Sequence, residues 1–426
     1  MESLKYALTT TFFPPFHLGG DAIHVELLAN ELVKRGNEVH VFYGLDAYLI
    51  KRGNRKIKEM EKDSSDHHGI HLHHYATLTP RLSTLAEYSF GISSITRKIE
   101  NDIKKLSPDV LHHHNISGIG QEILGIESPI KLYTAHDHWP ICQKSSYQRY
   151  DGEICQRPKH CMTCSLLSKR PCQIWRFSNS TEKIFSKIDC IISPSGYMAD
   201  ILISLGGLKN VTVLPNFVPD WENNDHSATF EIPYLLFVGS LEQNKGIDAL
   251  VSDFLDWKMD TKISLRIVGS GSSQKKIKEK INRDKRGNRV LLEGGLLRKN
   301  LASLYRNAIA VIIPSISPEN SPLVGLEAYC AGTPLIGTDI GGLPEMINRV
   351  SKNYVFHRGD FSKMREIIRS ILSNPPDRSR IRLFYEKYYS PESYIKGLRH
   401  ILDNKSMRGN HILAPVTKGS NYEVLL

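Results

Sequence analysis

The chain has 426 residues, 40% of them hydrophobic and 23% charged, which is enough for two α/β domains with full cores and is ordinary for a globular protein. No run reaches the roughly 18 uninterrupted apolar residues of a membrane-spanning helix, and the start, MESLKYALTTTFFPPF, lacks the pattern of a signal peptide, so we expect a cytoplasmic protein. The net charge of +10 favours anionic partners, namely nucleotide phosphates, acidic lipid surfaces or nucleic acid, unless it is a scattered solvated excess.

The first half of the chain alternates predicted strands and helices, which indicates a parallel sheet. Strands are expected over 4–10, 37–44, 69–76, 108–115, 130–137, 188–195 and 211–216, with helices over 21–35 and 196–205. Between the first strand and the first helix, Gly19 and Gly20 let the backbone approach a ligand at a helix N-terminus, because neither has a Cβ atom. The alternative is a loop that merely turns into the helix. No G-x-G-x-x-G follows the strand, so this is not a dinucleotide fingerprint.

Histidines crowd the next strands of this half. We do not expect a metal site there, because neighbouring residues of a strand face opposite sides and cannot all converge, and this applies to His67, His68, His71, His73 and His74. His136 differs, since it ends a strand, where parallel sheets bind ligands. The other interpretation of His136 is a hydrogen-bonded histidine at a strand end with no further role.

Residues 139–175 break the alternation. They show no helical or strand period, are rich in Lys and Arg, and contain five of the seven cysteines. Because cytosolic disulfides are uncommon, the C-x-x-C pair suggests a structural zinc that fastens a long loop lacking its own core. Its ligands would be Cys142, Cys155, Cys161 and Cys164, with Cys172 or His160 as substitutes. Free reduced cysteines or a redox pair are the alternatives.

The second half resumes the alternation after a linker that begins near Asn216. Residues 234–248 predict a strand, a loop and a helix entry, where Lys245 can face phosphate as a point charge. Strands are also expected at 263–272 and 290–296, but Gly269-x-Gly271 alone lacks the third glycine and the acid of an NAD site. Ser390 should cap a last amphipathic helix.

The most informative stretch is 314–347, PSISPENSPLVGLEAYCAGTPLIGTDIGGLPEMI. It predicts a strand ending at Ile313, a loop, a helix from near Ser321 and a second strand at 334–337, and the loop lies where parallel sheets bind ligands. A helix start suits a diphosphate, because its first N–H groups have no partner inside the helix. Glu319 and Glu327 bracket that start and would repel phosphate, so we expect them to accept hydrogen bonds from sugar or ribose hydroxyls. Alternatively, they are a first-turn helix charge and a solvated helix position.

This stretch resembles the E-x7-E signature of the retaining glycosyltransferases of family 4, in PENSPLVGLEAYCAGTPLIGTDIGGLPE. The similarity covers nearly the whole chain, including the glycine loop PPxxGG, the T-x-H segment, the P-N-x-V junction and the motif G-R-x4-K-G, where Ser240 replaces the arginine. It implies the α/β fold called GT-B, with two Rossmann-like domains facing a central cleft and a C-terminal helix that crosses back to the first domain. The implied parts are an acceptor-side domain at 1–216 with the Cys-rich insertion, a nucleotide-sugar-binding domain at 217–389, the crossing helix at 390–404 and a loose tail at 405–426.

The resemblance also implies roles for particular residues. Glu327 would hold the ribose hydroxyls and Glu319 the hydroxyls of the donor sugar, while Lys245 and the amides near the helix start would hold the departing diphosphate. Ser240 can donate a hydrogen bond but brings no charge. The implied catalytic residues are His136, Glu319 and Lys245, and the implied donor-binding residues are Gly19, Gly20, Ser240, Lys245, Gly269, Gly294, Ser321, Leu323, Val324 and Glu327.

The implied activity is transfer of a sugar from a nucleoside diphosphate sugar to an acceptor hydroxyl, with an α linkage as the product. The acceptor would be a glycan or a lipid-linked molecule in polysaccharide, lipopolysaccharide or glycolipid assembly. Catalysis would need no metal, and the protein would bind no nucleic acid but could associate peripherally with the inner face of the cell membrane. Two alternatives stay open: a sugar-nucleotide epimerase of the same fold, and a basic, zinc-clipped nucleic-acid-binding protein.

Overall fold

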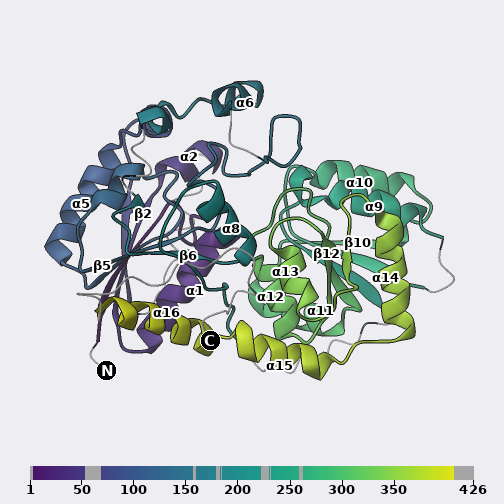
Figure 1. Cartoon of the computed structure of the whole chain (residues 1–426). Helices are drawn as coiled ribbons and strands as arrows, with labels where there is room; N and C mark the ends of the chain where they lie inside the picture. Colours follow the sequence, from purple (N-terminus) through teal and green to yellow (C-terminus); the bar gives the residue numbers. More distant parts are fainter. Residues whose placement is uncertain are drawn as a thin grey trace. The chain divides into compact units, whose positions relative to one another are not determined.

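The computed structural model of the chain describes residues 3–52, 69–156, 160–178, 183, 185–221, 230, 232–258 and 262–406. The chain divides into two compact units (Figure 1). Unit 1 extends to Pro215 and resumes at Ile395, whereas unit 2 runs from Asn216 to Tyr394. Each unit has its own hydrophobic core. Among the described helices, none combines the length and apolarity needed to cross a bilayer.

Unit 1 is built on a parallel sheet whose described strands lie in the order β3-β2-β1-β4-β5-β6-β7. Its strands are β1 (Lys5–Thr10), β2 (Glu38–Gly44), β3 (Ile70–Tyr75), β4 (Val110–His113), β5 (Ile130–Thr134), β6 (Cys190–Ser193) and β7 (Val211–Val213). Its helices are α1 (Gly20–Lys34), α2 (Asp46–Arg52), α4 (Pro80–Phe90), α5 (Ser94–Leu106), η2 (Gln121–Gly125), α6 (Cys161–Leu167), η3 (Ile174–Ser178) and α8 (Gly196–Ser204). The central strands are buried on both faces, as unbroken apolar runs in a parallel sheet predict.

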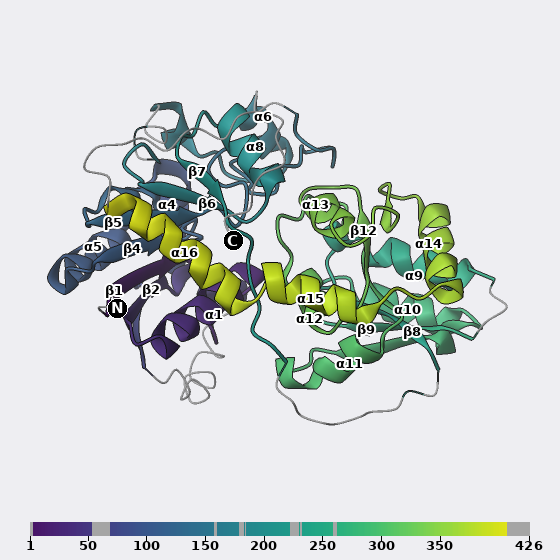
Figure 2. The same ribbon diagram turned by 60° about the horizontal axis from the view of Figure 1, so that its bottom comes forward.

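Unit 2 repeats this design with the strand order β10-β9-β8-β11-β12-β13, again parallel throughout the described part. Its strands are β8 (Tyr234–Val238), β9 (Ser264–Val268), β10 (Val290–Gly294), β11 (Ala310–Ile313), β12 (Leu335–Thr338) and β13 (Val355–Phe356). Its helices are η4 (Gln243–Lys245), α9 (Ile247–Asp256), α10 (Gln274–Arg283), η5 (Gly287–Arg289), η6 (Arg298–Asn300), α11 (Ala302–Asn307), α12 (Leu323–Cys330), α13 (Leu343–Asn348), α14 (Phe361–Ser373) and α15 (Arg378–Tyr388). The last helix, α16 (Pro391–Ser406), begins in unit 2 and belongs to unit 1 from Ile395 onward (Figure 2).

Both strand orders are those of the Rossmann fold, which confirms the predicted fold class. In such a sheet the chain winds outward in both directions from two central strands, and ligands bind beyond the carboxyl ends of these strands. The two central strands are β1 and β4 in unit 1, and β8 and β11 in unit 2. The loops that follow these four strands are therefore the places to look for a site.

Two predicted elements differ from the structure, and some predicted residues lie outside the part that the structure describes. The segment 139–175, predicted without regular structure, contains the helix α6. Helix α12 begins at Leu323 rather than near Ser321, because Pro322 has no N–H group and lies in an extended conformation as the N-cap. His67, His68 and all but the first two residues of the predicted tail lie outside the described residues.

Candidate functional site

The loops that follow β8 and β11 bring Lys245 and Glu319 together. Lys245 Nζ donates a hydrogen bond to Glu319 Oε1 at 2.6 Å, and Ser315 Oγ donates to the same oxygen at 2.6 Å. The two loops pack closely, because Gly246 has a φ of +71° and a Cβ atom there would clash with the carbonyl oxygen of Pro314. The sequence predicted both charged residues, and the structure places them as an ion pair between the loops that follow the two central strands.

The charge of Glu319 is fixed by its neighbours. Burial alone would raise the pKa of Glu319, but the charge of Lys245 and the hydrogen bonds from Lys245 and Ser315 lower this pKa below its usual value. Its backbone is also held, since the N–H of Gly342 donates to the Glu319 carbonyl oxygen at 2.6 Å. Both side-chain donors bind Oε1, so Oε2 of this anionic carboxylate is suited to accept a hydrogen bond from a ligand hydroxyl.

Three glycines line the carboxyl edge of the neighbouring strands. Gly239, Gly269 and Gly294 follow or end β8, β9 and β10, and all three have positive φ angles. The N–H of Gly239 donates to Val268 O at 3.0 Å, and the N–H of Gly269 donates to Gly294 O at 2.8 Å. A Cβ atom on Gly269 would clash with the carbonyl of Gly239. This edge of the sheet therefore has no side chains at these three positions, so a flat ligand can approach the backbone closely, and the exposed Ser240 follows Gly239 there.

The start of α12 lies in the same unit. Leu323 and Val324 are its first residues, so their N–H groups have no acceptor inside the helix. Gly325 N–H instead bonds to Pro322 O at 2.9 Å. Ser321 is buried, and its carbonyl oxygen accepts a hydrogen bond from Asn216 Nδ2 at 3.1 Å. Two amides at a positive helix end, a little beyond Glu319, suit an anionic group.

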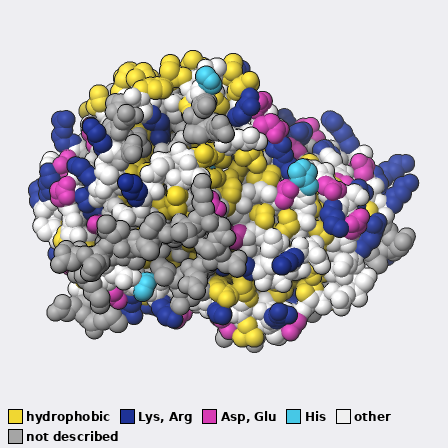
Figure 3. Space-filling view, viewed as in Figure 1, with side chains coloured by type: hydrophobic (Ala, Val, Ile, Leu, Met, Phe, Trp, Pro, Cys, Tyr) yellow, Lys and Arg dark blue, Asp and Glu magenta, His cyan; other side chains and the backbone are white. Residues whose placement is uncertain are grey.

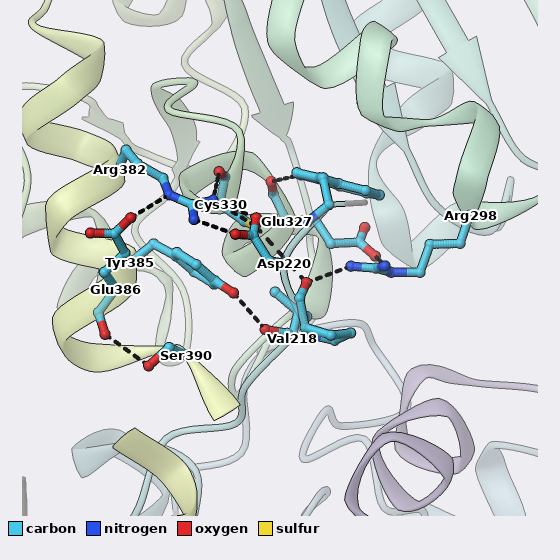
Figure 4. Close-up of polar contacts among 11 residues, drawn as sticks. Val218, Asp220, Arg298, Glu327, Cys330, Arg382, Tyr385, Glu386 and Ser390 are labelled. Carbon is cyan, nitrogen blue, oxygen red and sulfur yellow. Dashed lines mark hydrogen bonds and ion pairs between the residues drawn. The ribbon is translucent and has the colours of Figure 1, made fainter. Parts of the chain in front are cut away.

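Glu327 lies one turn into α12, in a setting that the sequence did not predict (Figure 4). Tyr305 donates its hydroxyl to Glu327 Oε2 at 2.7 Å, and Arg298 Nε lies 3.8 Å from Oε1. Burial raises the pKa of Glu327, and the hydrogen bond from Tyr305 and the charge of Arg298 oppose only part of this rise. No local pattern marks Tyr305 or Arg298, because they are brought to Glu327 by the fold alone.

The segment that enters unit 2 supports this carboxylate (Figure 4). Trp221 Nε1 donates to the carbonyl oxygen of Glu327 at 3.3 Å, and the guanidinium of Arg298 lies 4.3 Å from the centre of the Trp221 ring. Asp220 pairs with Arg382 of α15, which also donates to the Cys330 carbonyl at 2.7 Å. Glu327 and its helix are therefore held by a fixed polar framework.

In unit 1, the equivalent loops carry Gly19, Gly20 and His136. Gly19 is the N-cap of α1, and Gly20 opens this helix. His136 follows β5, and its Nε2 lies 3.0 Å from Nδ1 of His114. Burial lowers the pKa of His136 to about 4, against the opposing charge of Asp21, so its imidazole is neutral at pH 7. The described structure thus gathers one set of predicted residues in unit 1 and a second set in unit 2.

Two carboxylates beside His136, those of Asp21 and Asp137, were not predicted from the sequence as site residues. Asp21, in the first turn of α1, accepts a hydrogen bond from Asn115 Nδ2 at 2.7 Å, and Asn115 follows β4. Burial raises the pKa of Asp137 to about 7, although the N–H of Trp139 donates to this carboxylate at 2.7 Å. A carboxyl group at a strand end and next to a candidate catalytic histidine was a signal available from the sequence.

The four cysteines proposed as zinc ligands influence one another. Burial, followed by the charges of Cys142, Cys155 and Cys164, raises the pKa of Cys161 to about 11. All seven cysteines are free thiols. As the described side chains lie, no three of the types His, Cys, Asp and Glu are arranged to hold a metal ion. The structural zinc therefore stays a prediction, as do its alternatives.

Two family models match the chain. Residues 18–221 match the model of Glycosyltransferase Family 4, and residues 222–387 match the model of Glycosyl transferases group 1. An uncharacterized glycosyltransferase of Methanocaldococcus jannaschii is 25% identical over 363 residues, which cover 81% of this chain and 83% of that protein.

Solved structures share the fold. Sucrose-phosphate synthase from Thermosynechococcus elongatus has a TM-score of 0.70 at 18% identity and covers 94% of this chain and 98% of its own. HepE from Anabaena, in complex with UDP, has a TM-score of 0.64 at 15% identity, with 94% of this chain and 100% of HepE covered. These likenesses define the GT-B class of two Rossmann-like units.

Within that class, the chain belongs to the group 1 and family 4 glycosyltransferases. The predicted family is thereby confirmed, and the chain is a glycosyltransferase. Neither the epimerase nor the nucleic-acid-binding alternative is favoured by these matches.

Proposed function

We propose that this glycosyltransferase moves a sugar from a nucleoside diphosphate sugar to an acceptor hydroxyl with retention, leaving an α linkage. The observation that carries the proposal is the Lys245–Glu319 pair beyond the two central strands of unit 2, in a loop that leads directly into α12 and its first amides, those of Leu323 and Val324. A diphosphate needs a cation and free N–H groups, and a sugar needs an anionic acceptor for its hydroxyls. The HepE structure contains UDP, which supports a nucleoside diphosphate as the shared ligand type.

In this proposal each residue has one task. Lys245 and the two amides stabilise the negative charge of the departing diphosphate, and Ser240 adds a neutral hydrogen bond. Glu319 accepts hydrogen bonds from the donor sugar, and Glu327 accepts them from the ribose. The bare backbone at Gly269 and Gly294 admits the nucleoside. A fixed donor of this kind usually lowers the free energy of the transition state by about 3 kcal/mol.

His136, Gly19 and Gly20 are assigned to the sugar being transferred and to its acceptor. A neutral imidazole can donate one hydrogen bond and accept another, which suits a hydroxyl-bearing substrate. The acceptor is proposed to be a glycan or a lipid-linked molecule of polysaccharide, lipopolysaccharide or glycolipid assembly. A cytoplasmic location stays a prediction.

The stereochemistry can be tested without knowing the acceptor. In the absence of acceptor, the enzyme should slowly hydrolyse its α-linked donor, and proton NMR of the first product should show the α anomer of the free sugar. A Glu319→Gln variant, which keeps the shape but loses the charge, should release sugar at least tenfold more slowly. The β anomer as first product would overturn retention, and an epimerised sugar nucleotide would overturn transfer altogether.

A further inference from the structure

Four histidines of unit 1 form a layer on one face of its sheet. His112 lies in β4, His114 follows this strand, His136 follows β5, and His24 of α1 packs against the rings of His114 and His136. The centres of contacting rings lie between 4.2 and 6.2 Å apart. Histidine side chains cover little of the described surface on the face drawn in Figure 3, and in this histidine layer only His136 is as much as half-exposed to solvent, the other three being fully buried.

His114 and His136 share a hydrogen bond within the histidine layer. Nδ1 of His114 lies 3.0 Å from Nε2 of His136, the ring centres are 5.3 Å apart, and the ring planes differ by only 19°. The rings therefore meet edge to edge, which is the geometry that an imidazole N–H needs to reach the lone pair of a second ring. The backbone fixes both residues, because the N–H of His114 donates to Thr9 O at 2.9 Å and the N–H of His136 donates to Thr134 O at 3.1 Å.

Each of these two imidazoles carries a single ring proton at pH 7. Burial lowers the pKa of His136 to about 4 and the pKa of His114 well below its usual value, so both rings are neutral. A neutral imidazole has one N–H donor and one bare nitrogen that accepts. The contact therefore contains one proton, on His114 Nδ1 or on His136 Nε2, and its position sets the tautomers of both rings.

The other nitrogen of His114 decides between these two arrangements. His114 Nε2 is buried and has no hydrogen-bond partner among the described groups. If His136 donated to His114, the proton of His114 would have to sit on this Nε2, as a buried N–H without an acceptor. Such N–H groups are rarer in proteins than acceptors that lack a donor, so the proton of His114 belongs on Nδ1. His136 Nε2 then accepts the hydrogen bond, and the proton of His136 is on Nδ1.

We propose that His114 is a positioning residue for sugar transfer, which fixes the tautomer of His136 so that His136 Nδ1 donates a hydrogen bond to a substrate oxygen. In this tautomer His136 cannot take a proton from an acceptor hydroxyl through Nδ1, because that nitrogen already carries one. His136 therefore acts as a neutral donor and not as a base. This inference rests on the proposed function, in which His136 contacts the sugar being transferred or its acceptor.

The tautomer can be measured without any substrate. Long-range proton–nitrogen correlation spectra of the full chain, with its histidines labelled by nitrogen-15, distinguish a protonated ring nitrogen from a bare one. The signals of His136 are those that disappear in His136→Gln. At pH 7.5 the wild type should show His136 protonated on Nδ1 and bare on Nε2. In His114→Leu the proton of His136 should shift toward Nε2, whereas in His114→Asn it should stay on Nδ1, because the side-chain amide can replace Nδ1–H as the donor.

Hydrolysis of the donor supplies the matching activity measurement. His114→Leu should lower kcat/KM by about tenfold or more, since part of the enzyme then lacks the donor at Nδ1, while His114→Asn should stay within about threefold of the wild type. The matched control is His113→Leu. His113 is as fully buried as His114 and also loses a hydrogen bond, of 2.8 Å to Thr9 Oγ1, but it points to the opposite face of the sheet. His113→Leu should keep kcat/KM within about twofold of the wild type and leave His136 protonated on Nδ1.

Three results would contradict this role of His114: a wild-type His136 protonated on Nε2, a His114→Leu variant that keeps the His136 proton on Nδ1, or equal losses of kcat/KM in His114→Leu and His113→Leu. If His114→Leu does not fold, the wild-type spectrum still decides the tautomer, and an unchanged spectrum and activity in His114→Asn support the hydrogen bond. Failure of the proposed function would look different. It would appear as a β anomer or an epimerised nucleotide among the products, while the ring spectra would remain readable.

Discussion

Replacing Lys245 by methionine should lower kcat/KM for the donor about 100- to 1,000-fold, the usual cost of losing one fixed donor to a developing negative charge. Methionine keeps much of the chain length but removes the ammonium that meets Glu319 Oε1 at 2.6 Å. The diphosphate then loses its cation, and Glu319 is left with Ser315 as its side-chain donor. Both changes act in the same direction, because an uncompensated carboxylate also repels phosphate.

Lys276→Met is the matched control for this variant. Lys276 also pairs with a carboxylate of unit 2, Asp248, at 3.4 Å, but it is 67% exposed on α10. The kcat/KM of Lys276→Met should stay within about twofold of the wild type, since exposed ion pairs contribute little to stability.

The double variant Lys245→Met/Glu319→Gln distinguishes two roles of Lys245, binding the diphosphate and neutralising Glu319. Recovery of activity would mean that Lys245 only neutralises Glu319, and this result would contradict its assignment to the diphosphate.

Acid should unfold unit 1 well before unit 2. Eight described histidines of unit 1 have pKa values lowered mainly by burial; for His40 and His73 the lowering is smaller. The six with the larger shifts, including His112 and His113 at about 3, are His24, His112, His113, His114, His136 and His138. In the unfolded chain these groups regain a pKa near 6.5. The unfolded state therefore binds more protons below pH 6.5, and the stability of unit 1 falls as the pH drops from there toward 4.

Two acids oppose this trend. Asp137, with its pKa raised to about 7, and Glu87 hold protons in the folded state that unfolding would release, so they favour the folded state as the pH falls. The net uptake on unfolding should be roughly four protons, which corresponds to a loss of about 5 kcal/mol per pH unit below about pH 6. In the described part of unit 2 the only histidine is His357, whose side chain is 78% exposed.

The comparison can be made inside one molecule. The protein is equilibrated in urea at pH 7.5, 6.0 and 5.0, then labelled with a brief deuterium pulse at one common pH, and peptides of each unit are read by mass spectrometry. As the pH falls, the urea concentration at the unfolding midpoint should become much lower for peptides of unit 1. For peptides of unit 2 this midpoint should change little. His138→Asn should reduce the proton uptake by about one, whereas His357→Asn should not change it. Equal shifts in both units would contradict this account.

The fold could be predicted because its signals are local. Buried apolar runs marked most strands, and a parallel sheet with helices between its strands allows few topologies. Helix α6 was missed for a physical reason. Its leucines face solvent and Ser165 faces inward, so the outward and inward sides do not show the apolar period on which helix prediction relies.

The site could be predicted only where one loop or helix start carries the chemistry. Lys245 and Glu319 each stand in a loop after a central strand, and the structure brings them together as an ion pair. Tyr305 and Arg298 could not be found, because they reach Glu327 from α11 and η6 through packing that no short motif encodes. The neutral state of His136 likewise depends on burial that its neighbours in the sequence do not determine.

Calorimetry at fixed salt tests the central claim most directly, by titrating UDP, GDP, ADP and NAD into the wild type, Glu327→Ala and the control Glu366→Ala. Glu366 is an exposed residue of α14 that pairs only with Lys363 among the described contacts. We expect one nucleoside diphosphate to bind the wild type and the control alike, and to bind Glu327→Ala more weakly by about 1 to 3 kcal/mol, the cost of unpairing charged hydrogen bonds. Failure of every nucleoside diphosphate to bind, or equal binding by Glu327→Ala, would contradict the proposed donor site.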